Sequence, residues 1–196
     1  RWFAAVTGLV LLAGAVLAWR MQLLDGLFGR SRATPAATRQ WVWLAAFDGP
    51  PDDPGLASAA RDLVAAVLDQ SSIVAAVPID QVRIALRNAG RPDTARVDGT
   101  LARELAYRSS IRVVVEGRTG RIGPSYSILL RATDAENGRT MLSTVGRADK
   151  ERDVIQVLTR LGHELRRGFG ERPDALRARG AISAAATPSF EAFKLY

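Results

Sequence analysis

The longest uninterrupted hydrophobic run of the chain lies at its start. Residues 2–19, WFAAVTGLVLLAGAVLAW, contain no charged side chain and begin and end with tryptophan. At about 1.5 Å rise per residue, a helix of this length spans roughly 27 Å, close to the hydrocarbon thickness of a bilayer. Indole rings favour the headgroup level. The pattern therefore predicts a transmembrane helix over residues 1–20, with Trp2 and Trp19 as anchors in the lipid bilayer.

The flanks of this run bear on its processing and orientation. A cleaved signal peptide is the main alternative, but the run is long for a signal core, and WRMQ at its end lacks the small residues of a cleavage site. Four arginines between residues 20 and 39 would, by the positive-inside tendency, place the following domain in the cytoplasm. Residues 21–39 have the composition of a juxtamembrane linker.

Shorter periodic segments follow from residue 40 onward. Strands are expected at residues 40–47, 72–78, 111–117, 125–135 and 139–148. Helices with one apolar face are expected at residues 56–70, from a cap at Asp80 to Ala89, at about 98–109, and from Asp149 to Phe169. Gly90 ends the second helix, and Asn137-Gly138 marks a tight hairpin turn.

The order β-α-β-α-α-β-β-β-α predicts an α/β fold, with one mixed sheet and helices packed on it. The β-α-β opening favours parallel pairing, and the closing hairpins are antiparallel. Val114 and Leu158 are expected in the core. Alternation places further apolar side chains on one face of the fourth strand, namely Tyr126, Ile128, Leu130 and Ala132.

Composition narrows the possible functions. The formal net charge is +7, yet nearly all the positive charge is arginine scattered along the chain, with lysine only at Lys150 and Lys194. A nucleic-acid footprint needs clustered charge, so we expect no nucleic-acid binding. Cysteine is absent, which leaves no disulfide, thiol nucleophile or cysteine metal site.

Three groups of residues are candidates for a catalytic or ligand-binding role. His163, the only histidine, has no obvious catalytic partner, so we expect it at the surface. Asp48, Asp52 and Asp53 follow the first strand, where α/β sheets bind ligands, but turn formation and helix capping also account for them. GRTGRIG, residues 117–123, lacks the Gly-Lys-Ser/Thr of a phosphate loop and is expected to be a flexible hairpin loop. The segment is therefore expected to be non-catalytic, with no cofactor and no metal.

The last residues, TPSFEAFKLY at 187–196, have the pattern of a helix start. Thr187-Pro188 suit a cap and a first turn, and an apolar stripe then recurs at helical spacing, formed by Phe190, Phe193 and Tyr196. Such a short helix cannot bury this stripe alone. We expect its partner helix further along a longer chain.

The run IDQVRIALRNAGRPDTARVDGTLARELAYRSSIRVVVEGRTGRIGPSYSILLRATDAENGRTM, together with VWLAAF, DGPPDDP and the hydrophobic start, resembles a known arrangement. It is similar to the region between the transmembrane helix and the tetratricopeptide repeats of bacterial serine/threonine protein kinases and related membrane-bound regulators. It is also similar to the amino-terminal α/β domain of TolB and to FlgO-type envelope proteins. In that arrangement TPSFEAFKLY corresponds to the first helix of the first repeat.

The resemblance implies an extracytoplasmic sensor or binding module of a single-pass protein in the bacterial inner membrane, with a kinase before Arg1 and a protein partner on the downstream repeats. An envelope scaffold that acts only through protein contacts is the alternative. The implied organisation is a transmembrane helix at 1–20, a linker at 21–39, an α/β domain at 40–172, a connector at 173–186 and the first repeat helix at 187–196.

Overall fold

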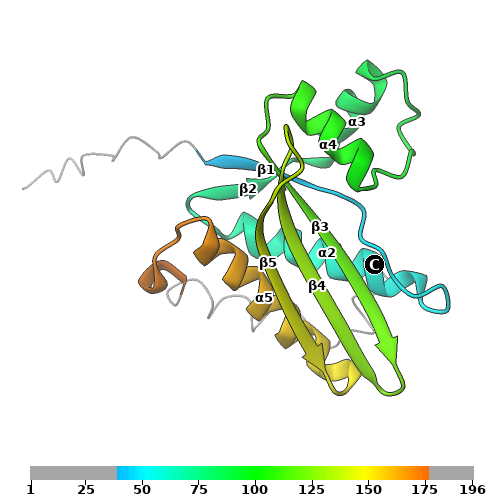
Figure 1. Cartoon of the computed structure of the whole chain (residues 1–196), viewed down its shortest axis with the longest axis vertical. Helices are drawn as coiled ribbons and strands as arrows, with labels where there is room; N and C mark the ends of the chain where they lie inside the picture. The colour runs from blue at the N-terminus through cyan, green and yellow to red at the C-terminus, as the bar shows by residue number, and fades with distance from the viewer. Residues whose placement is uncertain (1–38, 177–196) are drawn as a thin grey trace, which may run out of the picture. The chain divides into compact units, whose positions relative to one another are not determined.

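The computed structural model describes residues 39–176 (Figure 1). Its elements are β1 Gln40–Leu44, α2 Pro54–Asp69, β2 Val74–Ala76, α3 Ile79–Asn88, α4 Gly99–Arg108, β3 Val113–Ile122, β4 Ser125–Asp134, β5 Thr140–Ala148, the 3-10 turn η1 Glu151–Asp153 and α5 Val154–Gly168. This order matches the predicted one. No helix among these residues combines the length and the apolar character needed to cross a bilayer. The predicted transmembrane helix and terminal repeat helix, with Trp2, Trp19, Phe190, Phe193 and Tyr196, lie outside the described residues.

The five strands form one mixed sheet in the order β2-β1-β3-β4-β5. Strand β1 pairs in parallel with β2 and with β3, whereas β3-β4 and β4-β5 pair antiparallel. The predicted mixed sheet is therefore confirmed. Strands β3 and β4 are ten residues each and β5 is nine, so they extend well beyond the short parallel strands.

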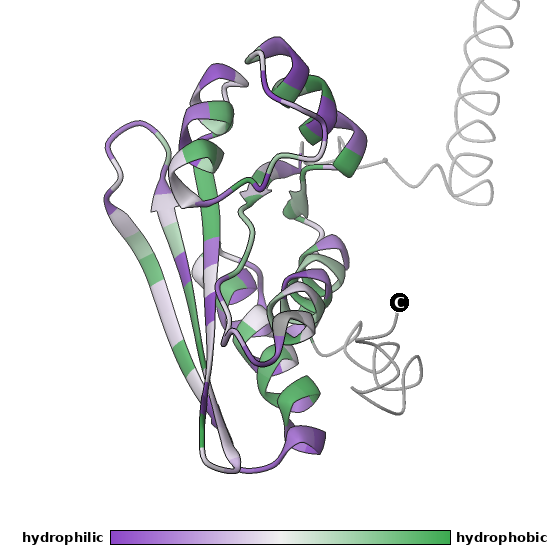
Figure 2. Cartoon of the chain, turned by 90° about the vertical axis from the view of Figure 1, so that its right-hand side faces the viewer, coloured by the Kyte–Doolittle hydropathy of each residue, from purple (hydrophilic) through white to green (hydrophobic). Residues whose placement is uncertain are grey.

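Helices α2 and α5 cover one face of this sheet (Figure 2). The side chains that alternation assigned to one face of β4 are all buried there, and Leu158 from α5 is fully enclosed. Gly162 lets the two helices approach closely, because a β-carbon on it would lie 2.7 Å from Val67 Cγ1. This face holds the larger of two hydrophobic cores.

Helices α3 and α4 cover the opposite face only beside β1 and the first residues of β3. Their core contains Trp43, Val114, Leu86 and Leu105, all essentially inaccessible to solvent. Asp98 begins α4 by accepting backbone hydrogen bonds from Thr100 and Leu101 at 3.0 and 2.9 Å. In Figure 2 these helices lie at the upper end of the sheet, and the long strands continue past them.

The segment GRTGRIG is not a flexible loop, as its sequence suggested. Residues 117–122 complete β3, and the chain reverses at Gly123-Pro124. Gly117 is required by packing, because a β-carbon there would lie 2.3 Å from the Phe47 ring. Glycines are common in loops, but Gly117 lies in a strand, where its missing side chain leaves room for the Phe47 ring from the segment after β1.

Several predicted element ends also differ. Strand β1 stops at Leu44, although the chain stays beside β3, where Asp48 N–H donates to Gly117 O at 2.9 Å and Thr119 N–H to Asp48 O at 2.7 Å. Asp80 does not cap α3, because that helix begins at Ile79 and its cap position is Pro78, which has no side chain donor or acceptor. Likewise α5 begins at Val154, after the turn η1, instead of at Asp149.

Candidate functional site

The three aspartates after β1 do not converge on one point. Asp48 is exposed and pairs with Arg96 at 3.0 Å and more weakly with Arg118 at 4.0 Å. Asp53 accepts a hydrogen bond from Leu56 N–H at 3.2 Å and caps α2. Asp52 is exposed in the intervening turn. Turn and cap roles account for their positions, and no three His, Cys, Asp or Glu side chains within residues 39–176 are placed to hold a metal ion.

His163 is half-buried instead of lying on the surface, contrary to expectation. It lies on α5 beside Arg166, and its Nε2 is enclosed without a hydrogen-bond partner among the described residues. Burial lowers the pKa of His163 below its ordinary 6.5, and the positive charge of Arg166 lowers it further. A neutral, enclosed imidazole that reaches no nucleophile is unsuited to general-base chemistry.

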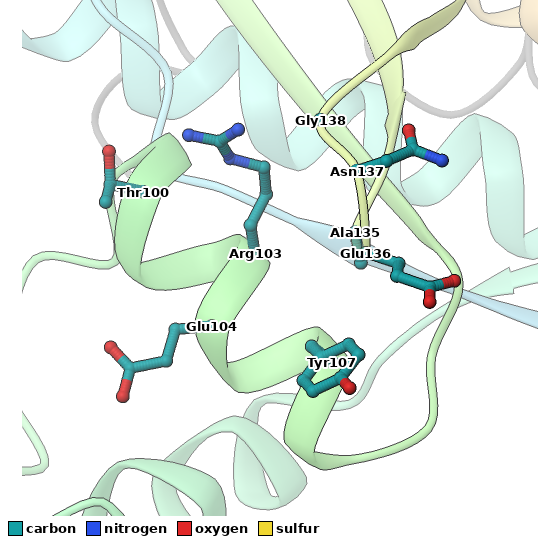
Figure 3. A pocket seen from close by; sticks show the side chains of 8 residues that line it. All are labelled: Thr100, Arg103, Glu104, Tyr107, Ala135, Glu136, Asn137 and Gly138. Atoms are coloured by element: carbon teal, nitrogen blue, oxygen red, sulfur yellow. The ribbon is translucent and has the colours of Figure 1, made fainter.

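A hollow of about 390 Å³ lies between α4 and the β4-β5 turn (Figure 3). Its polar side chains point in different directions around it. Arg103 Nε donates to Gly99 O at 3.4 Å, Glu104 pairs with Arg108 at 2.7 Å, and Asn137 Oδ1 accepts from Arg139 N–H at 2.9 Å. Groups already bonded to their own helix or turn do not form a convergent binding site.

The most strongly perturbed carboxylate is structural. Glu171 is buried with Arg166, which donates from Nε to Oε2 at 2.6 Å and from Nη2 to Oε1 at 3.0 Å. Burial alone would raise the pKa of Glu171, but hydrogen bonds from Arg166, Ser71 Oγ and Ser72 N–H lower it to about 2. The cluster ties the end of α5 to the α2-β2 connection. Arg166 and Glu171 are only five residues apart, but the groups that enclose them, Val67 O and Ser71, lie about a hundred residues away in the sequence. The sequence therefore does not show that this pair is buried.

One face of the antiparallel strands, the face away from α2 and α5, carries exposed side chains. The register aligns side chains in three rows across β3, β4 and β5, on the face opposite α2 and α5. We call this surface the open face. Its rows are Glu116, Arg131 and Ser143; Arg118, Leu129 and Val145; and Gly120, Ser127 and Arg147. Figure 1 views the sheet from this side, with α2 and α5 behind it.

The open face has an apolar centre with basic surroundings. Leu129 and Val145 are cross-strand partners, and Val145 remains 69% exposed. Arg118 lies directly across from Leu129, while Arg131 and Arg147 occupy the neighbouring rows. The only carboxylate of the three rows, Glu116, is partly buried, and its Oε1 is 2.5 Å from where a β-carbon of Gly99 would be. Leu129 itself is half-buried. A partly exposed apolar pair surrounded by arginines resembles the composition of protein interfaces.

A sequence signal for this surface existed. The alternation that assigns Ile128 and Leu130 to the core necessarily puts Ser127, Leu129 and Arg131 on the opposite face. The sequence does not show how far α3 and α4 extend over this face, where α4 reaches Glu116.

No protein-family model matches the chain, and no curated protein matches it. Among solved structures, the LpoB C-terminal domain from Escherichia coli matches with a TM-score of 0.51 and 12% identity, over 65% of this chain and 93% of that one. The LpoB C-terminal domain from Salmonella enterica gives 0.50 and 11%, over 61% and 89%. The described domain has an LpoB-like fold. TolB from Acinetobacter baumannii matches at 0.41 and 10%, over 67% of this chain and 27% of that one.

Proposed function

We propose that residues 39–176 form a non-catalytic, protein-binding domain on the outer side of a bacterial inner membrane. The observation that carries the protein-binding role is the open face, where the exposed Val145 and its half-buried partner Leu129 are surrounded by arginines. Among the described residues with shifted pKa values, Glu171 and Asp134 bond to arginines, and His163 is half-buried on α5. This arrangement favours binding over catalysis.

The proposal of an extracytoplasmic location rests on the resemblance to TolB and FlgO-type envelope proteins and on the transmembrane anchor that the sequence predicts at residues 1–20. The LpoB-like fold agrees with that resemblance. The finer proposal is a sensor module of a single-pass signalling protein, a serine/threonine kinase with tetratricopeptide repeats after residue 187. An envelope scaffold is the second candidate. Kinase motifs in the native sequence upstream of Arg1 would favour the first.

Site-specific photocrosslinking in cells tests the binding role. A photoreactive phenylalanine replaces Val145 in the complete native protein, and a matched control carries it at Ile79, which is 55% exposed on α3. We expect one discrete crosslinked protein from position 145 and none of that size from position 79. Absence of a specific product at 145, with the protein folded and present at normal level, would overturn the proposed role of the open face.

The outward location has its own test. A phosphatase reporter that folds only outside the cytoplasm, fused after Tyr196 in the complete native protein, should be active. A cytoplasm-dependent reporter at the same position should be inactive. The reverse pair of results would place the domain inside the cell, as the arginines after Trp19 suggest.

A further inference from the structure

We propose that the partner presents an acidic, extended segment, which pairs with the free edge of β5 and adds a strand to the sheet. This inference rests on the proposed function, because it names the partner chemistry of the open face. Strand β5, Thr140–Ala148, is the last strand of the sheet on its side, and no described strand pairs with its outer edge. Strand addition uses such an edge, with main-chain hydrogen bonds for affinity and alternate side chains for specificity.

The register indicates which backbone groups face that edge. Ile122 and Ser125 are paired across the two-residue turn Gly123-Pro124, so they form the hydrogen-bonded pair that closes the hairpin. Hydrogen-bonded and non-hydrogen-bonded pairs alternate along antiparallel strands. Followed through β4 into β5, this alternation directs the N–H and C=O groups of Ser143, Val145 and Arg147 away from β4.

The edge is held rigidly from the other face of the sheet. A β-carbon on Gly146 would lie 2.5 Å from Val157 Cγ1, so α5 packs directly against the β5 backbone. The end of α5 also contacts β5, because a β-carbon on Gly168 would lie 2.6 Å from Leu142 Cδ1. Strand β5 contains no proline. A strand already fixed by α5 loses little conformational freedom when a partner pairs with it.

The residues with outward backbone groups also carry the side chains of the open face. An added strand would therefore place its own side chains beside Ser143, Val145 and Arg147. Arg131 is the cross-strand neighbour of Ser143, so a second guanidinium lies one strand further in. A partner strand would complement this surface if it placed an apolar residue beside Val145 and a carboxylate beside each of Ser143 and Arg147.

The charge of the chain itself argues for a separate partner. Residues 1–38 contain four arginines and one aspartate, and residues 177–196 contain two arginines, one lysine and one glutamate. Neither terminal segment supplies the acidic strand. A second copy would bring together two arginine-bearing faces on chains of net charge +7, which opposes self-association.

A designed peptide tests the chemistry directly. The probe is a blocked, fluorescently labelled peptide, Glu-Thr-Val-Thr-Glu, in which the two Glu and the Val lie on one face of a strand. It is added to the 196-residue chain in detergent, and binding is followed by fluorescence anisotropy. Two control peptides are matched to it. One carries Lys in place of Glu, and the other is N-methylated at every residue, so that neither of its edges can pair as a strand. We expect saturable binding of the acidic peptide alone, weakened by added salt.

Two protein variants distinguish the contribution of backbone hydrogen bonds to peptide binding from the contribution of charge. Val145→Pro removes an N–H that faces the free edge, a position where a strand tolerates proline, whereas Val145→Ala retains it. Arg147→Glu should weaken peptide binding about five- to tenfold, because an exposed ion pair is replaced by repulsion. Arg83→Glu on α3 carries the same charge change far from β5 and should bind like the unmodified chain.

The outcomes are distinct. Equal binding of the acidic and N-methylated peptides would exclude strand addition without requiring any protein variant. Equal binding of the Glu and Lys peptides would exclude an acidic partner. A stable dimer in light scattering that disappears in Val145→Pro would identify a second copy as the occupant and overturn the proposal. If the crosslink at position 145 persists while these tests fail, the protein-binding function stands and only the strand-addition proposal is wrong.

Discussion

Arg166 and Glu171 form an ion pair that is excluded from solvent, with Nε and Oε2 2.6 Å apart and side chains 0% and 1% exposed. Arg166 also donates to Val67 O at 3.3 Å, and Ser71 Oγ donates to Glu171 Oε2 at 2.7 Å. The pair therefore joins the end of α5 to the carboxyl end of α2.

Replacing Glu171 by Gln should destabilise the domain by about 3–5 kcal/mol, because the Arg166 charge would remain buried without a counter-charge. The free energy of unfolding from a denaturant titration measures this loss. Asp174→Asn is the control, since the pair of Asp174 with Arg172 is exposed. It should change stability by less than about 0.5 kcal/mol. Similar small values for both variants would show that the buried pair is not needed for stability.

The same pair predicts an acid-sensitive contribution to stability. The pKa of Glu171 falls from its ordinary 4.5 to about 2 on folding, so between these values the unfolded chain binds more protons than the folded one. The stabilisation is complete above pH 4.5 and is lost as the pH falls toward 2. Unfolding titrations at several pH values should show a weaker acid dependence for Glu171→Gln than for the unmodified chain. Parallel curves would contradict the lowered pKa.

The pKa of His163, the single histidine of the chain, reports the burial of its side chain on α5. Because burial lowers the pKa of His163, its imidazole resonances should titrate with a midpoint below 6.5 in the folded protein. The unfolded state then takes up a proton first, so stability decreases as the pH falls below 6.5. His163→Gln should remove this part of the pH dependence. A midpoint at or above 6.5 in an NMR titration would place the ring in solvent.

Leu158 and Val145 provide a contrast between the two faces of the sheet. Leu158 is fully buried, so Leu158→Ala should cost about 2–5 kcal/mol. Val145 is 69% exposed on the open face, and Val145→Ala should change stability by less than about 0.5 kcal/mol. Thermal unfolding of both variants measures the difference. A large loss for Val145→Ala would show that another part of the chain covers the open face.

Hydrogen exchange distinguishes a strand from a flexible loop at residues 117–122. Thr119 N–H, which donates to Asp48 O at 2.7 Å, should exchange slowly, whereas the turn at Gly123 should exchange fast. Gly117→Ala should destabilise by about 1–3 kcal/mol, because its β-carbon would overlap the Phe47 ring. Gly120→Ala would meet only Ser127 Oγ, at 2.9 Å, and should cost less.

The sequence by itself determined the order and type of the elements. Alternating apolar residues specify β4, and apolar residues at helical spacing specify α5, because each element must bury one face regardless of its neighbours. Gly90 marks a helix end, because its positive φ of 68° suits glycine. Such signals depend on residues only a few positions apart, so they can be recognised in the sequence before the tertiary structure is known.

Tertiary structure decided where local signals were ambiguous. The glycines of GRTGRIG fit either a loop or a strand, and the Phe47 ring against Gly117 selects the strand. His163 is expected at the surface, but packing of α5 against α2 half-buries it and encloses its Nε2. The same packing buries Arg166 and Glu171. The open face also depends on how far α3 and α4 extend over the sheet. These outcomes depend on contacts between residues distant in sequence, whose energies no local pattern contains.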